Sequence, residues 1–326
     1  MIDRLTDPAT LLLIARGLLF AGAGELAGAL LFEVGVAPLP RGRRLLLWGG
    51  WVTAVLAALL LLFAQAARFG HRALADVVGS GVLSITVTRT RFGHVMMVEL
   101  ALVAATALAL AAAARSRRRA STLALLPAAG MLATLAWIGH GGDDRGLAGV
   151  VHLVADTLHL LGMGAWLGGL LPLALLIAAA ERSGETEAIV AARKAIWRFS
   201  SRCLWAVGVL AGAGIVNAWF LMGSLGAFIT TPYGQLLLIK IGVFLAMFTL
   251  AAVNREILIP RLSGRLPGDA LARVRQTLPG MARNTWLIAA LAIAVIGIVA
   301  RLGTLPPALH DMSQMSKMDM PSGHPH

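Results

Sequence analysis

Eight apolar segments, each long enough to cross a lipid bilayer, dominate this sequence and restrict what it can fold into. A helix that spans the hydrocarbon core of a membrane needs about 20 predominantly apolar residues. The predicted fold is therefore an all-α polytopic membrane protein, in which residues 1–304 form a bundle of eight transmembrane helices. The segments are residues 8–34, 45–67, 95–114, 121–139, 151–180, 197–222, 232–256 and 284–302.

The composition supports a membrane protein over a soluble one. The chain is 58% hydrophobic and 13% charged, whereas about a quarter of the residues of a soluble domain are charged. A formal net charge of +12 is compatible with nucleic-acid binding, but basic loops between membrane spans account for it more simply. We expect no nucleic-acid partner. The single cysteine, Cys203, excludes an internal disulfide and any C-x-x-C metal motif.

Basic residues gather in the loops that follow the first, third, fifth and seventh segments. Because such loops remain in the cytoplasm, we expect both termini to face the periplasm of a bacterial cell. Residues 68–94, with four arginines, are a partial exception to the alternation. The basic loop residues are Arg41, Arg43, Arg44, Arg115, Arg117, Arg118, Arg119, Arg182, Arg193, Lys194, Arg198, Arg255, Arg261, Arg265, Arg273, Arg275 and Arg283.

The fifth segment carries a stripe of possible metal ligands. If residues 151–180 form one helix, His152, Asp156, His159, Met163 and Trp166 follow one another at steps of four, three, four and three and share one face. Imidazole, carboxylate and thioether groups bind transition metals. Ionisable residues are costly within a membrane, so we interpret this stripe as functional.

Other ionisable residues fall in the outer halves of the predicted helices, among them Arg16. Charged groups at this depth normally face the bundle interior or water, which predicts a polar vestibule open to the outside. Glu25 is the deepest acidic group and could pass an ion inward. The predicted metal ligands are His94, Met97, Glu99, His140, His152, His159 and Met163, and the possible pathway residues are Glu25, Asp156, Trp166, Asn217 and Lys240.

Each of these residues also has a simpler structural interpretation. A single histidine at a membrane interface is commonly hydrogen-bonded there without binding a metal. Asp156 could orient a histidine, Met163 could fill the core, and Trp166 could pack or anchor the interface. We interpret the glycines of three clusters as sites where helix backbones approach closely. These clusters are Gly22, Gly24 and Gly28; Gly162, Gly164, Gly168 and Gly169; and Gly208, Gly212 and Gly214.

Residues 305–326 form a predicted flexible periplasmic tail rich in methionine and histidine. Its small polar residues cannot bury a core, so the methionines are not explained by packing. Thioethers bind soft Cu(I) and imidazole suits either copper ion, so copper is the expected metal, with zinc second. The tail residues predicted to capture metal are His310, Met312, Met315, Met318, Met320, His324 and His326.

Several polar motifs resemble those of the copper resistance protein D family of bacterial inner-membrane proteins. The resemblance is closest over about residues 121–260. The motifs that carry it are 139–140 (GH), 155–159 (ADTLH), 165–172 (AWLGGLLP), 198–200 (RFS), 216–219 (VNAW), 231–234 (TPYG), Lys240 and 252–255 (AVNR).

This resemblance implies a multi-pass copper transport protein of the inner membrane and not an enzyme. It implies uptake of periplasmic copper in copper homeostasis or resistance, a soluble CopC-like copper carrier as partner, and copper handling by His140, His152 and His159. Glu25, Glu33, His94, Met96, Met97 and Glu99 depart from the family pattern as we expect it. Two alternatives stay open: a haem-binding electron carrier or copper reductase, and a copper sensor or oxidase copper-loading factor.

Overall fold

The computed structural model describes residues 7–40, 42–112, 116–139, 146–263 and 269–309. Within these residues all regular secondary structure is helical, with no strand. The long helices are α2 (Pro8–Gly35), α3 (Arg43–Gly70), α5 (Arg91–Ala112), α6 (Arg117–Ile138), α7 (Gly146–Leu167), α8 (Leu170–Ser183), α9 (Thr186–Met222), α11 (Pro232–Val253) and α13 (Asp269–Leu302). The short ones are η1 (Leu74–Asp76), α4 (Val82–Arg89), α10 (Ala227–Thr230), the π-helical η3 (Asn254–Leu258) and α12 (Ile259–Arg261).

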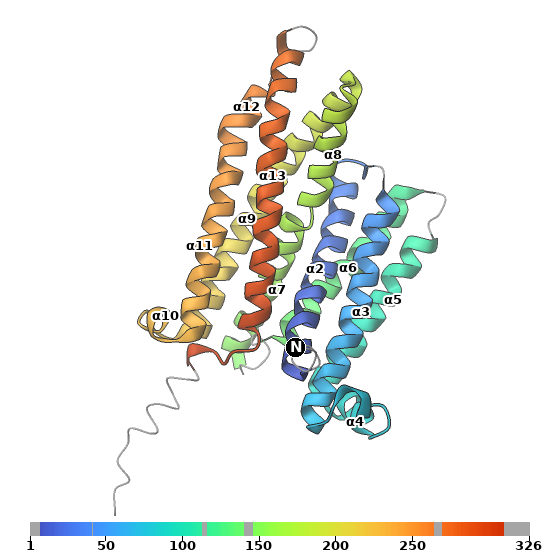
Figure 1. Ribbon diagram of the computed structural model, residues 1–326, viewed down its shortest axis with the longest axis vertical. Coiled ribbons are helices and arrows are strands. Elements are labelled where there is room, and N and C mark those ends of the chain that lie inside the picture. The colour runs from blue at the N-terminus through green and yellow to red at the C-terminus, as the bar shows by residue number, and fades with distance from the viewer. Residues whose placement is uncertain (1–6, 41, 113–115, 140–145, 264–268, 310–326) are drawn as a thin grey trace, which may run out of the picture.

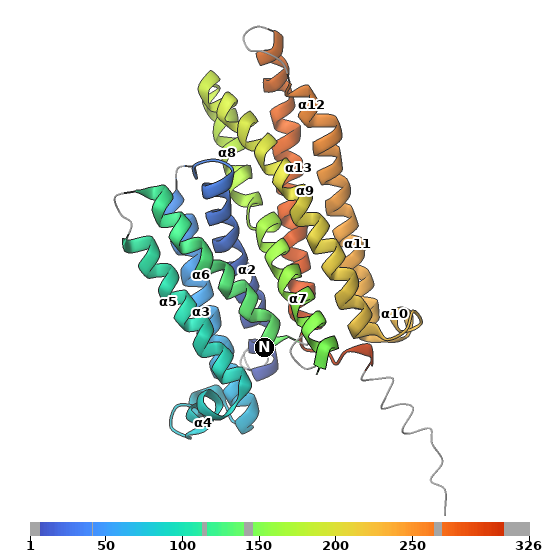
Figure 2. The ribbon, with the colours of Figure 1, turned by 180° about the vertical axis from the view of Figure 1, so that it is seen from behind.

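Eight helical stretches in the described part of the chain are long and apolar enough to cross a membrane. This confirms the predicted eight-helix polytopic fold. The N-terminal end of α2 and the C-terminal end of α13 lie at the same end of the bundle as α4 and α10 (Figures 1 and 2). At the opposite end lie the C-terminal ends of α2, α5, α8 and α12 and the N-terminal ends of α3, α6, α9 and α13. The helix ends that flank the basic loops therefore share one end of the bundle. That this end faces the cytoplasm stays a prediction, as does the boundary of the tail.

The prediction of one continuous helix over residues 151–180 is wrong. The helix breaks at Gly168 and Gly169, so that α7 and α8 are separate segments within one membrane crossing. Glycine has a low helix propensity, and at this point α2 approaches backbone to backbone. A Cβ atom at Gly168 would collide with the carbonyl oxygen of Gly24.

The glycine clusters serve close packing in two of the three cases. A Cβ at Gly22 would lie 2.7 Å from the backbone nitrogen of Ala54 in α3, and a Cβ at Gly28 would collide with the backbone of α7 near Gly164. In α9, however, a Cβ at Gly208 or Gly212 would meet nothing within 4 Å. The packing interpretation is therefore wrong for those two glycines, because their side of α9 faces open space.

Among the described helices, α9 and α13 begin more than ten residues before their predicted apolar segments, and the short helices η1, α4 and α10 lie in connections where no helix was predicted. The helix α9 starts at Thr186 instead of 197, and α13 starts at Asp269 instead of 284. In α9 the exposed Trp197 and Trp219 are 22 positions apart, which is about 33 Å at 1.5 Å per residue. Tryptophan favours the membrane interfaces, so the first turns of α9 extend beyond the apolar layer. The unpredicted α4 lies in the 68–94 connection.

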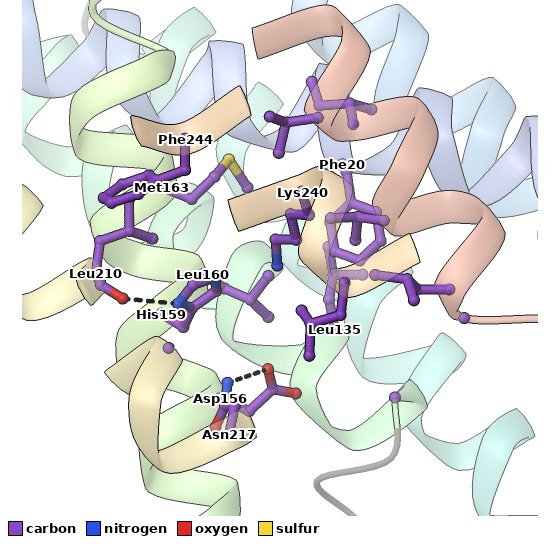
Figure 3. Close-up of a pocket in the computed structure, with 18 of the residues that line it drawn as sticks. Phe20, Leu135, Asp156, His159, Leu160, Met163, Leu210, Asn217, Lys240 and Phe244 are labelled. Atoms are coloured by element: carbon purple, nitrogen blue, oxygen red, sulfur yellow. Dashed lines mark hydrogen bonds between the residues drawn. The ribbon is translucent and has the colours of Figure 1, made fainter. Parts of the chain in front are cut away.

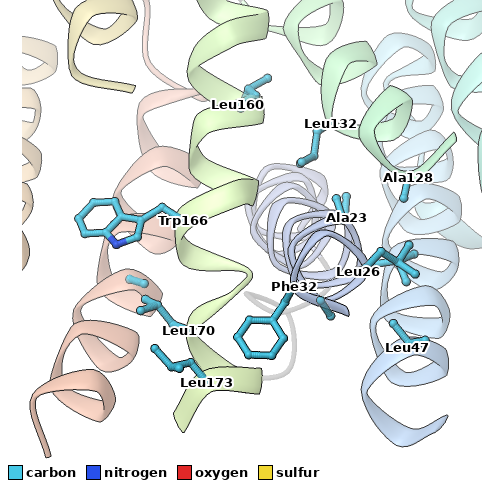
Figure 4. Close-up of a cluster of buried hydrophobic side chains, with 14 of the residues drawn as sticks. Ala23, Leu26, Phe32, Leu47, Ala128, Leu132, Leu160, Trp166, Leu170 and Leu173 are labelled. Atoms are coloured by element: carbon cyan, nitrogen blue, oxygen red, sulfur yellow. The ribbon is translucent and has the colours of Figure 1, made fainter. Parts of the chain in front are cut away.

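Helix α2 lies at the centre of the bundle, and half of its most apolar window is buried. It contacts α3, α6, α7, α8 and α13. Figure 4 shows Ala23, Leu26 and Phe32 of α2 among side chains from its neighbours, including Leu132 and Trp166. The remaining helices are therefore arranged around α2.

A polar cluster ties α2, α3 and α6 together at the end that carries the basic loops. The Nε atom of Arg43 donates to Glu33 Oε1 and Oε2 at 2.8 Å each, and Arg43 Nη2 donates to Ser121 Oγ at 3.0 Å. The Ser121 hydroxyl donates to Glu33. Both charged side chains are largely buried, with exposed fractions of 17% for Arg43 and 5% for Glu33. This cluster explains the presence of Glu33 near the end of an apolar segment.

We expect Gly28→Ala to destabilise the protein, because the added methyl group must separate α2 from α7. Overpacking of this kind costs about 1–3 kcal/mol. The matched control is Gly212→Ala, which adds the same group at a helical glycine with no neighbour within 4 Å. Thermal unfolding of the two variants in detergent measures the difference. Equal midpoints would contradict the proposed backbone crossing.

The Arg43–Glu33 pair gives a second stability prediction. Arg43→Met leaves a buried carboxylate without its cation and should reduce the free energy of unfolding by about 3–5 kcal/mol. In the double variant Arg43→Met/Glu33→Gln no charge is stranded, so the loss should be smaller than the sum of the single losses by about 0.5–3 kcal/mol. Chemical unfolding of all four proteins in detergent measures this coupling, and strict additivity would argue against the pair.

Candidate functional site

A cavity of about 450 Å³ lies between α2, α7, α9, α11 and α13. It extends from Tyr233 and Gly303, at the bundle end that carries α10, to Trp166 and Leu167 beside the α7–α8 break. Most of its lining is leucine, isoleucine, valine and phenylalanine. The titratable, charged and amide side chains in the lining are Arg16, His152, Asp156, His159, Asn217, Tyr233 and Lys240.

All five residues of the predicted stripe on α7 line this cavity, which supports the expectation that they share one face. They are His152, Asp156, His159, Met163 and Trp166. His152 and Met163 are eleven residues apart, which corresponds to about 16 Å along a helix. The donors are therefore spread along the depth of the cavity. Whether they bind a metal stays a prediction.

The hydrogen bond of His159 fixes which of its ring nitrogens faces the cavity. Nδ1 lies 2.9 Å from the carbonyl oxygen of Leu210 in α9. Because a carbonyl only accepts, Nδ1 carries the proton, and in the neutral ring Nε2 keeps a free lone pair. No described residue hydrogen-bonds Nε2, and that edge of the ring faces the side from which Lys240 enters (Figure 3). A Cβ at Gly214 would lie 3.2 Å from His159 Cε1, so the glycine leaves room for the ring.

Asp156 and His152 form the outer part of the stripe. Asp156 Oδ1 accepts a hydrogen bond from Asn217 Nδ2 at 3.2 Å, which links α7 to α9 (Figure 3). Asp156 also interacts electrostatically with His152 and Lys240. The ring of His152 is buried and stacks on Phe220 with 4.8 Å between centroids and 4° between planes. These contacts hold both side chains in place.

Met163 and Trp166 form the deep end of the cavity. A Cβ at Gly24 would lie 3.4 Å from the Met163 sulfur, so this thioether packs beside α2 at the place where α2 crosses α7. Trp166 is buried and makes an edge contact with Phe244 of α11 at 6.0 Å between centroids. The indole packs within the protein, in agreement with the structural interpretation of this residue.

Two cations enter the cavity from other helices. Lys240 projects from α11 and interacts electrostatically with both Asp156 and His159. From α2, Arg16 donates to the carbonyl oxygen of Gly303, directly after the end of α13. Its Nε atom is buried without a partner in the described part of the structure.

Four predicted site residues do not line this cavity. His94 is exposed, with Nε2 3.1 Å from the Thr88 carbonyl oxygen, and Met97 is 49% exposed. Glu99 is fully buried between α5 and α6 and is hydrogen-bonded to the hydroxyl of Thr134. The expectation of one vestibule shared by all the outer-half residues is therefore wrong. Position in the sequence gives the depth of a residue but not the side of the bundle on which it lies.

Glu25 is also absent from the cavity lining, although it lies in α2 next to Gly24. Its Oε1 atom is buried and has no partner among the described residues. His140 and the predicted capture residues of the tail fall outside the described residues. Within the described residues, no three His, Cys, Asp or Glu side chains are grouped to hold a metal ion.

Some lining residues and anchors were not predicted from the sequence. The carbonyl of Leu210 has no sequence signal, whereas Tyr233 belongs to the TPYG motif. That motif starts α11: the Thr231 hydroxyl accepts from the Gly234 amide at 3.0 Å. At the other end of α11, Asn284 donates to Asn254 at 2.9 Å, and Arg255 donates to the Ser200 hydroxyl at 3.2 Å. The AVNR and RFS motifs therefore pack α11 against α13 and α9.

Two family models match this chain. Residues 193–302 match the copper resistance protein D model, and residues 1–150 match the model of the copper resistance protein D-like N-terminal domain. Together the two matches cover most of the chain and leave out residues 151–192, which hold nearly all of α7 with its five cavity-lining residues, α8 and the start of α9.

Three curated relatives are similar over about two thirds of the chain. Copper resistance protein D of Pseudomonas syringae pv. tomato is 28% identical over 227 residues, which are 68% of this chain and 71% of the relative. Inner membrane protein YebZ of Escherichia coli K12 is 29% identical over 217 residues, 66% of this chain and 70% of that protein. Copper transport protein CutJ of Bacillus subtilis 168 is 28% identical over 222 residues, 66% of this chain but 40% of that protein.

No solved structure matches this chain. The two family models and the three relatives nevertheless agree with the motifs of the sequence and with the helical bundle. The chain therefore belongs to the copper resistance protein D family, as a multi-pass protein of the inner membrane.

Proposed function

We propose that this protein conducts copper across the inner membrane, from the periplasm to the cytoplasm, through the cavity beside α7. It acts as a transport protein in copper homeostasis or resistance and not as an enzyme. The observation that carries the proposal is the orientation of His159. Its Nδ1 atom is held by the Leu210 carbonyl oxygen at 2.9 Å, so that the Nε2 lone pair is available in the cavity.

A histidine that binds a metal through one ring nitrogen usually donates its other N–H to a carbonyl or carboxylate. His159 is held in that way before any ion arrives. Met163, one helical turn deeper, adds a thioether, and Asp156, about one turn toward the outer end, adds a carboxylate. Nitrogen and thioether donors suit copper better than they suit magnesium or calcium. The order of donors supports a stepwise path inward along α7.

The direction of transport follows from electrostatics. The cavity begins at the bundle end opposite the basic loops, and basic loops favour the cytoplasmic side. A membrane potential that is negative inside lowers the free energy of an inward-moving cation by about 2.3 kcal/mol per charge per 100 mV. Ligands spread along the cavity bind an ion weakly enough for it to move on. Copper uptake by this route needs no ATP.

Copper reaches the cavity through groups at the periplasmic face in this proposal. The methionines and histidines of residues 305–326, together with His94 and His140, concentrate the ion there. A CopC-like periplasmic copper carrier delivers it. Glu25 and Glu99 lie outside the cavity lining, and the proposed path does not pass through them.

No contact of the described residues favours the haem alternative. The two described histidines of the cavity, His152 and His159, come from the same face of the same helix. A haem with two histidine ligands needs them on opposite sides of its ring. A copper sensor or copper-loading factor would bind the ion without moving it, so copper flux into proteoliposomes separates these functions from transport.

The main test is the variant His159→Asn, which removes the imidazole. Loss of even an outer-shell partner of a metal lowers its affinity about 10–100-fold, so we expect at least a tenfold loss of copper affinity and much lower copper accumulation in cells. Elemental analysis of cells with equal amounts of protein in the membrane measures accumulation. The control is His71→Asn, because His71 is exposed at the end of α3, outside the cavity, and asparagine tolerates its positive φ of 49°.

Equal copper accumulation by His159→Asn and the wild type would exclude this face of α7 as the route. Accumulation lost equally in His71→Asn would show that the effect does not depend on the cavity.

Met163→Leu tests the contribution of the thioether. The two side chains have similar volumes, so the fold should lose less than about 1.5 kcal/mol of stability. We expect weaker binding of Cu(I) or Ag(I) and little change for Zn(II), since soft ions prefer sulfur. Competition titrations of the purified protein measure these affinities. Met222→Leu, at a buried methionine outside the cavity lining, is the control and should bind like the wild type.

A further inference from the structure

The fixed charges of the cavity are unusual for a path that carries a cation. Lys240 and Arg16 are positive, and Asp156 is the one acidic residue that the described structure places in the lining. The other titratable side chains in the described lining are His152, His159 and Tyr233. Among the described lining residues, basic side chains therefore outnumber acidic ones by two to one.

The two cations differ in their relation to the proposed ligands. The guanidinium of Arg16 donates to the Gly303 carbonyl at the end of α13, where the partial negative charge of the helix terminus balances it. Lys240 comes from α11, on the other side of the cavity from α7, and acts electrostatically on both Asp156 and His159. Figure 3 shows its side chain extending toward His159. The basic group that an ion meets at His159 is therefore Lys240.

Leucine and phenylalanine side chains surround this charge. Leu237 and Phe244, one turn before and after Lys240, line the same cavity, as do Leu160 and Leu210 opposite. Apolar surroundings lower the effective dielectric constant and strengthen the interaction between charges. Repulsion between the Lys240 ammonium and an ion at His159 is therefore screened much less than it would be at a protein surface.

We propose that Lys240 is a specificity-determining residue that makes the cavity select monovalent Cu(I) over divalent ions such as Zn(II) and Cu(II). The inference rests on the proposed function of the cavity as the copper path. Coulomb repulsion is proportional to the charge of the ion, so a divalent ion loses twice as much free energy to Lys240 as a monovalent ion. The imidazole of His159 and the thioether of Met163 still bind the soft monovalent ion.

Without Lys240, the donors on α7 would not distinguish between these ions well. An imidazole and a carboxylate, as in His159 and Asp156, also form zinc sites. The positive charge of Lys240 offsets the attraction of a divalent ion to Asp156. Binding then depends on the uncharged donors, His159 and Met163. In this arrangement His159 and Met163 provide ligands, whereas Lys240 selects by charge and touches no ion.

The test compares Lys240→Met with the wild type in the purified full-length protein at pH 7. Ag(I) serves as a redox-stable monovalent probe and Zn(II) as a divalent one, each measured by competition titration. We expect Lys240→Met to raise both affinities, with the factor for Zn(II) near the square of the factor for Ag(I). A tenfold gain for Ag(I) would thus accompany about a hundredfold gain for Zn(II). Each ion is compared with itself, so differences in ligand preference cancel.

Three variants complete the design. Lys240→Arg keeps the charge and should keep the wild-type selectivity. Asp156→Asn removes the opposite charge and should lower both affinities, again with the larger factor for Zn(II). The double variant Lys240→Met/Asp156→Asn keeps the net charge, so its ratio of Ag(I) to Zn(II) affinity should return toward the wild-type ratio. This variant keeps the proposal testable if either single variant folds poorly.

Equal factors for Ag(I) and Zn(II), or unchanged affinities in Lys240→Met, would overturn the selection by charge and leave the proposed copper path intact. By contrast, His159→Asn with both affinities unchanged would overturn the path itself, and the role of Lys240 with it.

Discussion

Direct contact between the backbones of α2 and the broken α7–α8 crossing is the constraint on which the rest of this structure depends. A Cβ atom at Gly28 of α2 would collide with the backbone of Gly164 and Gly168, and one at Gly168 would collide with the carbonyl oxygen of Gly24, so side chains larger than hydrogen at Gly28 and Gly168 would force the helices apart. In a membrane, where lipid is as apolar as leucine, such packing is a main source of helix association. The crossing brings the Met163 sulfur against α2 and forms the deep end of the cavity.

Polar groups in the apolar layer are held by neighbouring helices. His159 is bonded to α9 through a carbonyl and Asp156 is bonded to α9 through Asn217. Arg16 reaches the end of α13. Because an ionisable residue in hydrocarbon is costly, each such contact stabilises the bundle and fixes the direction of a side chain. The same contacts that make these residues tolerable also leave the His159 Nε2 atom directed to the cavity.

Much of the fold could be predicted from the sequence, since the length of an apolar segment is a direct consequence of membrane thickness. The end of α9 at Met222 agrees with the end of its predicted apolar segment. The prediction of one helix over residues 151–180 was wrong, because contact with α2, and not the periodicity of the sequence, determines the break at Gly168 and Gly169. The sequence prediction also missed the early start of α13 at Asp269, because a helix continues into water wherever neighbouring segments support it.

The sequence by itself determined the all-helical membrane class, the shared face of α7 and the family, because these depend on composition, periodicity and local motifs. Only the tertiary structure decided which polar residues meet. It brought Lys240 and Arg16 to the α7 stripe and separated Glu99 from it. Residues at the same depth in different helices can face opposite sides of a bundle. Their direction is set by how the helices rotate and pack against one another, and no single helix encodes that rotation.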